Sequence, residues 1–139
     1  MIQLVYVSSA VSRFDDGSLM KLLDVSRRNN EAVGITGLLL YRDGNFMQVI
    51  EGEREVVLAL HRRIEADLRH HGLITMISQE IAQRDFSQWS MGFRNMTDPA
   101  LEQMPGFSDF LNIDFAELGA SQNTSKANRL LDVFRAGLR

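Results

Sequence analysis

Two polar side chains, Gln48 and Tyr6, fall on otherwise apolar faces of segments that are expected to form strands. Gln48 lies between Phe46 and Ile50 in an alternating pattern, so its amide is expected to be buried. A buried amide that leaves a hydrogen bond unmade costs about 1–3 kcal/mol, so it needs partners in the protein or in a ligand. Tyr6 is expected on a neighbouring strand, with its hydroxyl within reach of that amide. The pair is therefore interpreted either as a satisfied core contact or as part of a ligand site.

Other polar residues are candidates for the same site. Asn29 and Asn30 are expected at the end of a helix, where asparagine is a common C-cap, although they also come close to the layer of the first pair. Trp89 and Met91 alternate along a short extended segment, which indicates edge packing. A charged cluster on a second predicted helix forms either a solvated face or a phosphate contact. Its members are Arg62, Arg63, Asp67, Arg69, His70 and His71.

Hydropathy and turn residues predict the elements that must hold these side chains. Strands are predicted over residues 2–8, 34–42, 45–51 and 74–82, with a short extended segment over 89–93. Helices are predicted over 18–30, with Ser18 as N-cap, and over 53–70, ending before Gly72. The buried face of the second helix is expected to consist of Val57, Leu60, Ile64 and Leu68.

This order is βαββαβ with an extra β-strand, which predicts an α+β fold of the ferredoxin-like kind. In that plan the first and third strands lie side by side at the sheet centre, and both helices cover one face. Both faces of these central strands are apolar, so the second face also needs a cover. We expect that cover from residues 98–139, a connector and two short amphipathic helices, which could instead form a dimer or partner surface. The predicted division is a domain over 1–97 and a helical extension over 98–139.

Composition excludes several classes of function. The 139 residues contain no cysteine and three histidines, which excludes disulfides and thiolate chemistry and argues against a histidine-rich metal site. The net charge of −3 argues against a nucleic-acid partner. No apolar run reaches the roughly 18 residues of a membrane helix, and the N-terminus does not read as a signal peptide, so a cytoplasmic protein is expected. Rossmann and Walker motifs are missing, so a nucleotide would have to bind in another way.

Several ordered pieces of the sequence resemble the BLUF domain, a blue-light sensor that uses FAD. These pieces are LVYVSSA, SRRNNEAVGITGLLLY, NFMQVIEGE, RRIEADLRHH and FSQWSMGF, and together they cover about residues 2–93. The resemblance implies that the isoalloxazine ring lies between the two helices, over the sheet. It also implies a short, stand-alone sensor that is not itself an enzyme. Such a chain would signal to an unknown downstream protein, and a homodimer is expected.

The same resemblance implies roles for individual residues. Tyr6 matches the photochemical tyrosine of the family, and Gln48 matches the glutamine that hydrogen-bonds both the tyrosine and the flavin. Trp89 and Met91 match the variable pair that competes for the place beside the glutamine. FAD is the expected cofactor, with FMN or riboflavin as substitutes, and no metal is expected. The implied cofactor-binding residues are Asn30, Gln48, Tyr6, Asn29, Arg27, Arg63, Ile64, Asp67, Arg69 and His70.

The implied mechanism is a light-driven transfer of an electron and a proton from Tyr6 through Gln48. It leaves Gln48 with changed hydrogen bonds to the flavin, and the signal passes through the last strand to the C-terminal helices. The lack of cysteine fits a photochemistry without a covalent adduct. Three alternatives are kept: a small acylphosphatase-like hydrolase, an RNA-binding sheet, and a protein-interaction module without a cofactor.

Overall fold

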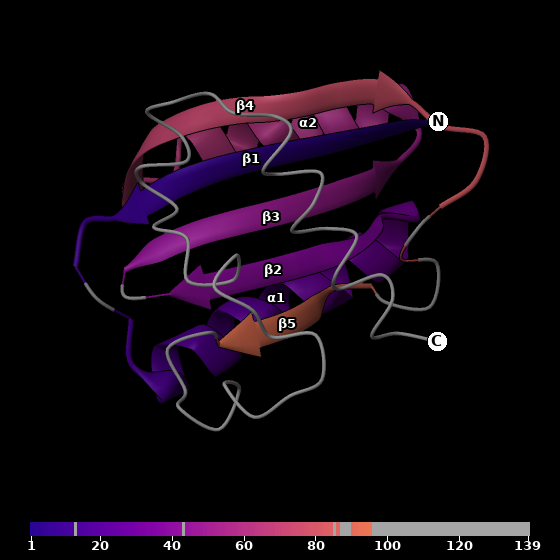
Figure 1. Ribbon diagram of the computed structural model, residues 1–139. Helices are drawn as coiled ribbons and strands as arrows, with labels where there is room; N and C mark the ends of the chain where they lie inside the picture. The colour runs from indigo at the N-terminus through magenta and orange to yellow at the C-terminus, as the bar shows by residue number, and fades with distance from the viewer. Residues whose placement is uncertain (13, 43, 85, 87–89, 96–139) are drawn as a thin grey trace, which may run out of the picture.

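The computed structural model describes residues 1–12, 14–42, 44–84, 86 and 90–95, and the fold is given for these. The elements are β1 (Ile2–Ala10), α1 (Asp16–Val33), β2 (Thr36–Arg42), β3 (Asn45–Gly52), α2 (Arg54–Glu65), β4 (His70–Glu80) and β5 (Gly92–Asn95). The sheet has the order β4-β1-β3-β2-β5. The first four strands pair antiparallel, and β5 pairs parallel with β2. Figure 1 shows both helices on the same face of the sheet, which confirms the predicted ferredoxin-like α+β fold.

The register of the central strands places the two polar candidates opposite each other. Tyr6 on β1 pairs with Gln48 on β3, and Gln48 pairs with Leu39 on β2. Because side chains alternate along a strand, these three residues lie in one row on the face that α1 and α2 cover. Tyr6 and Leu39 belong to the core cluster on that face, together with Leu19 and Leu23 from α1. The row is therefore buried between the sheet and the helices.

The ends of α1 differ from the prediction. Its N-cap is Asp15, whose carboxylate accepts a 2.7 Å hydrogen bond from the backbone N–H of Ser18, so the assignment of Ser18 as the cap was wrong. At the other end, Gly34 has a φ of 72° and donates its N–H to the Asn30 carbonyl. Glycine adopts this left-handed conformation without a steric penalty, so the helix runs on to Val33. Asn29 and Asn30 thus lie inside the helix, and the interpretation of these residues as a cap was wrong.

The second helix ends earlier than predicted, at Glu65. The carboxylate of Asp67 accepts hydrogen bonds from the backbone and side chain of Arg69, a local arrangement that competes with a continued helix. Leu68 is consequently 89% exposed and does not belong to the buried face. Asp67 and Arg69 lie in the connection to β4, and His70 and His71 begin that strand, so none of these four is on the helix as predicted.

Gly72 lies near the start of β4, where the pairing with β1 is irregular. The strand begins at His70 rather than at residue 74, and its pairing with β1 shifts between Val7 and Ser9. Gly72 lies at this irregularity with a φ of 65°. A β-bulge favours a residue that tolerates a positive φ, so Gly72 belongs to the strand and does not end the helix.

The last strand and the second sheet face complete the described part. β5 covers residues 92–95 rather than 89–93, and Met91, which directly precedes it, is 1% exposed. On the face away from the helices, Val5, Leu38 and Val49 are also buried. The segment predicted to cover that face, residues 98–139, lies outside the described residues, as does Trp89. Within the described ranges, no helix is both long and apolar enough to cross a membrane.

Candidate functional site

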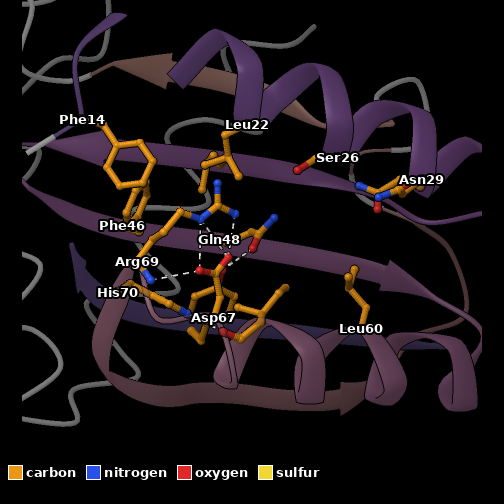
Figure 2. Close-up of a pocket in the computed structure, with 14 residues that line it drawn as sticks. Phe14, Leu22, Ser26, Asn29, Phe46, Gln48, Leu60, Asp67, Arg69 and His70 are labelled. Atoms are coloured by element: carbon orange, nitrogen blue, oxygen red, sulfur yellow. Dashed lines mark hydrogen bonds and ion pairs between the residues drawn. The ribbon is translucent and has the colours of Figure 1, made fainter. Parts of the chain in front are cut away.

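A cleft opens between α1 and α2, above the row that contains Tyr6 and Gln48. The cleft has a volume of about 680 Å³, part of which is open to solvent. Figure 2 shows Leu22 and Asn29 on one helix facing Leu60 on the other across this space. Its lining consists of Tyr6, Phe14, Leu22, Ser26, Asn29, Asn30, Leu39, Phe46, Gln48, Leu60, Ile64, Asp67, Arg69 and His70.

At the floor of the cleft, polar contacts connect Tyr6, Gln48 and Met91 in that order. The hydroxyl of Tyr6 donates a hydrogen bond to the side-chain carbonyl Oε1 of Gln48. The other end of the same amide, Nε2, lies 3.5 Å from the sulfur Sδ of Met91. Tyr6 is 4% exposed and Gln48 is 6% exposed, so both groups are almost completely removed from water while they still line the cleft. This arrangement gives each end of the buried amide one partner and keeps the amide on the lining of the cleft.

The surroundings of Tyr6 keep its phenol protonated. Burial raises the pKa of Tyr6 above its ordinary value, because a phenolate would lose its hydration, and the negative charge of Asp67 raises it further. The rings of His61 and His70 flank the phenol, with centroids 6.1 Å and 6.4 Å from that of Tyr6. The hydroxyl therefore retains the proton that it donates to Gln48 in its hydrogen bond.

One wall of the cleft is formed by α1. Asn30 is 3% exposed, and its Nδ2 donates a 2.8 Å hydrogen bond to the backbone carbonyl of Ser90. An asparagine amide has two N–H donors and a carbonyl oxygen, so Asn30 can hydrogen-bond a ligand without giving up Ser90. Asn29 lies at the same end of the lining, whereas Ser26 and Leu22 lie farther along α1. A ligand edge that carries both a donor and an acceptor fits this end of the cleft.

The opposite end is formed by the connection between α2 and β4. The Nη2 of Arg69 lies 2.6 Å from the Oδ2 of Asp67 (Figure 2). The hydrogen bonds from Arg69, aided by its charge, lower the pKa of Asp67 to about 2. Next to this pair, His70 contacts the Ser8 hydroxyl through Nδ1 and the Ile64 carbonyl through Nε2. These contacts fix a polar rim at this end of the cleft.

The structure brings most of the candidate residues together, but not all. Those that line the cleft are Tyr6, Asn29, Asn30, Gln48, Ile64, Asp67, Arg69 and His70. Met91 reaches the site through Gln48. Arg27 and Arg63 are not in the lining; Arg63 is exposed on α2, and Arg27 donates a 2.9 Å hydrogen bond to the Met91 carbonyl. Trp89 is outside the described residues.

Sequence reasoning did not assign six of the lining residues to the site: Phe14, Leu22, Ser26, Leu39, Phe46 and Leu60. Leu39 could have been found, since the hairpin register between β2 and β3 pairs it with Gln48. Phe14 precedes α1 in a connection without periodicity. Its position depends on tertiary contacts, including a 3.0 Å hydrogen bond from its N–H to the Tyr41 hydroxyl and a ring contact with Phe46 at 5.3 Å.

The donor set and the shape of the cleft fit a flavin. Six apolar side chains, Phe14, Leu22, Leu39, Phe46, Leu60 and Ile64, offer surface for a flat aromatic ring system. The amides of Asn30 and Gln48 offer both donors and acceptors, which complement the carbonyl and N–H groups at the polar edge of an isoalloxazine ring. The residues present are therefore suited to hold this cofactor.

Comparison with known proteins gives the same result. The family model of BLUF, described as sensors of blue-light using FAD, matches residues 1–92. Photoactivated adenylate cyclase subunit beta of Euglena longa is 29% identical over 110 residues, which make up 78% of this chain and 13% of that protein. Subunit alpha of Euglena gracilis is 30% identical over 115 residues, which make up 81% of this chain and 11% of that protein. The chain thus spans a small part of the length of these relatives.

Solved structures resemble the chain over most of its length. The BLUF protein BlrB in its dark state matches with a TM-score of 0.77 and 28% identity, covering 98% of this chain and 96% of that one. BlsA in its photo-activated state matches with a TM-score of 0.75 and 28% identity, covering 94% and 91%. Because the family match extends over residues 1–92 and the fold agrees with that of BLUF proteins, the chain belongs to the BLUF family of flavin-dependent blue-light sensors.

Proposed function

We propose that this chain is a blue-light photoreceptor in which FAD lies in the cleft and Tyr6 and Gln48 carry the photochemistry. The main support is the set of contacts at the cleft floor, from the Tyr6 hydroxyl through the Gln48 amide to the Met91 sulfur. An oxidisable phenol is followed by an amide that can both donate and accept, and then by a weak acceptor. This is the chemistry that a reversible hydrogen-bond switch needs.

The cofactor is proposed to be held by residues from both walls. Asn29 and Asn30 would hydrogen-bond the polar edge of the ring system, and Ile64 would pack on the ring. At the opposite end, Asp67, Arg69 and His70 would meet the ribityl chain and the rest of the cofactor tail. FAD is proposed as the main flavin because the family description names it. FMN and riboflavin contain the same ring system, so both are expected to substitute.

The switch itself is proposed to use the hydrogen bond between Tyr6 and Gln48. When bound, the flavin supplies the absorption of blue light and a transient acceptor for one electron. Tyr6 gives up that electron, and its hydroxyl proton moves to the Gln48 carbonyl oxygen. When the charge separation reverses, the electron and the proton return to Tyr6, so no residue is oxidised at the end. Gln48 is left either with its amide groups exchanged or as the imidic acid tautomer of its amide, and it would therefore offer different hydrogen bonds to the cleft.

The signal is proposed to leave the site through Met91 and β5. Met91 contacts the Gln48 amide and directly precedes β5, at the sheet edge beside β2. Residues 98–139 follow this strand and, in the proposal, carry the change to a downstream protein or to a second copy of the chain, in the cytoplasm. The names of the two Euglena relatives pair photoactivation with adenylate cyclase, which supports a separate effector as the partner. No catalytic reaction is proposed for this chain itself.

The deciding experiment is an absorption spectrum of the purified protein before and after blue light, followed during recovery in the dark. We expect a flavin spectrum, a small reversible red shift, and FAD as the flavin that is released on denaturation. A protein that stays colourless after reconstitution with FAD would contradict the proposal and favour a cofactor-free interaction module. A flavin spectrum that does not respond to light would contradict the photoreceptor mechanism but not flavin binding.

A further inference from the structure

Two successive backbone carbonyls before β5 are held by side chains of α1. Arg27 donates its Nε–H to the Met91 carbonyl at 2.9 Å, and Asn30 donates Nδ2 to the Ser90 carbonyl at 2.8 Å. Arg27 and Asn30 are three residues apart, so they project from the same side of the helix. We call Ser90 and Met91 the entry segment of β5. The two hydrogen bonds tie this entry segment to α1. Ser90 and Asn30 are 60 positions apart, so the contact joins distant parts of the chain.

The two contacts of Met91 differ in strength. Its carbonyl accepts from a guanidinium, and such charge-assisted hydrogen bonds are roughly twice as strong as neutral ones. Its sulfur is a weak acceptor, and it lies 3.5 Å from the Gln48 Nε2. Arg27 is half-buried, which limits the competition from water for its donor. The position of Met91 is thus determined more by Arg27 than by Gln48.

We infer that Arg27 is a positioning residue that holds Met91 against Gln48 and thereby sets the lifetime of the light-induced state. The inference rests on the proposed function for the existence of that state. It also assigns to Arg27 a contact other than the flavin contact implied by the family resemblance, because Arg27 is not in the cleft lining. Arg27 acts by hydrogen-bonding the Met91 carbonyl, which connects α1 to the entry segment.

The direction of the effect follows from the chemistry of the amide. In the structure, Gln48 offers its amide N–H group to the Met91 sulfur, and we take this as the arrangement before illumination. When Gln48 exchanges its amide groups, its carbonyl oxygen faces that sulfur, and two acceptors then oppose each other. As long as Arg27 keeps Met91 in place, this unfavourable contact persists and favours the return of Gln48. Without Arg27, Met91 can move away, so the light-induced state is expected to last longer.

The test compares the dark recovery of two arginine variants from the same helix. Arg27→Met removes the donors and keeps an unbranched side chain, and we expect its recovery to be about tenfold slower, the effect of ~1.4 kcal/mol in activation free energy. Arg28→Met makes the same change of charge at an exposed position whose Nε donates to the Asp24 carbonyl of its own helix at 3.4 Å. Its recovery is expected to match that of the unmodified protein. Arg27→Lys, which keeps the charge, should give an intermediate rate.

A second readout does not depend on the photocycle. In the dark, the backbone amides of residues 90–95 should exchange hydrogen faster in Arg27→Met than in Arg28→Met, because the entry segment has lost its tie to α1. Flavin content should be equal in the two variants. Equal recovery rates in the two variants would overturn the inference, and so would flavin loss confined to Arg27→Met, which would make Arg27 a flavin contact. If the unmodified protein shows no photocycle, the proposed function fails, and unchanged exchange at residues 90–95 would separately reject the tie.

Discussion

The hydroxyl of Tyr6 donates its hydrogen bond to the side-chain carbonyl of Gln48, and the two residues face each other across the central pair of strands. Their backbones are in register, so the contact is built into the pairing of β1 and β3 and needs no flexible loop. The Gln48 amide is thereby oriented, with its carbonyl toward Tyr6 and its N–H group toward Met91. In the proposed mechanism, this defined orientation is the starting point of the light-driven change.

Replacing Tyr6 by phenylalanine removes the hydroxyl and preserves the ring that fills the core. Tyr6→Phe is expected to fold and bind flavin but to lose the red-shifted state, because the electron and proton donor is missing. The measurement is the light-minus-dark absorption difference. Tyr41→Phe is the matched control, since Tyr41 is the other tyrosine of the chain and its hydroxyl accepts from the Phe14 N–H rather than contacting Gln48. A normal shift in Tyr6→Phe would show that the assigned role of Tyr6 is wrong.

Replacing Gln48 by leucine tests the amide. Gln48→Leu retains a side chain of similar size but can neither accept from Tyr6 nor donate toward the cleft, so flavin binding without the red shift is expected. The Tyr6 hydroxyl loses its partner in this variant, and stability should fall by about 1–3 kcal/mol. Gln79→Leu changes an exposed glutamine in the same way and should keep the shift. If the shift of Gln48→Leu equals that of Gln79→Leu, the switch does not depend on this amide.

The raised pKa of Tyr6 predicts a loss of stability at alkaline pH. In the unfolded chain the phenol ionises above about pH 10, whereas in the folded protein burial keeps it protonated. The unfolded state then binds fewer protons, so the free energy of unfolding falls as pH rises above 10, by up to about 1.4 kcal/mol per pH unit from this group. Urea titrations at a series of pH values measure this slope. Tyr6→Phe lacks the group and should show a shallower decline, and identical slopes would contradict the prediction.

A buried carboxylate on the other sheet face is expected to stabilise the connection that leads toward β5. Glu51 is 0% exposed and accepts hydrogen bonds from Gln3 Nε2 at 3.0 Å, from the N–H of Phe86 at 2.9 Å and from Thr36 Oγ1 at 3.3 Å. Arg84 adds a 3.2 Å contact to the Glu51 backbone carbonyl. Glu51→Ala removes the acceptor of these hydrogen bonds from a buried position, so a loss of at least about 2 kcal/mol is expected from urea unfolding.

An exposed glutamate provides the control for that measurement. Glu53 makes no side-chain cap hydrogen bond to α2, and its side chain is exposed, so Glu53→Ala should change the free energy of unfolding by less than about 0.5 kcal/mol. The two variants carry the same change of net charge. If they unfold at the same urea concentration, the contacts of Glu51 do not contribute to the stability of the fold.

The local sequence indicated the first three strands and the faces on which Tyr6 and Gln48 lie, whereas the starts of β4 and β5 differ from the prediction. Side chains alternate between the two faces of a strand, and this alternation depends only on the local sequence. It is therefore enough to predict that Tyr6 and Gln48 lie on buried faces. The order of the elements then indicated the ferredoxin-like plan, and with it the central position of β1 and β3. The helix ends were predicted less well, because Asp15 and the pair of Asp67 and Arg69 form side-chain hydrogen bonds that decide them.

The contacts that bring distant segments together around the cleft are decided by the tertiary structure. The position of Phe14 beside Phe46 and the contact of Arg27 with Met91 join residues that no local pattern relates. Arg27 and Met91 are 64 positions apart, and their contact exists because β5 pairs with β2 and brings the entry segment beneath α1. A hydropathy pattern gives the face of an element, but it does not give the partner that the element meets. The buried pairing of Tyr6 with Gln48 could therefore be predicted from the sequence, whereas the contacts that hold Met91 beside them depend on the tertiary structure.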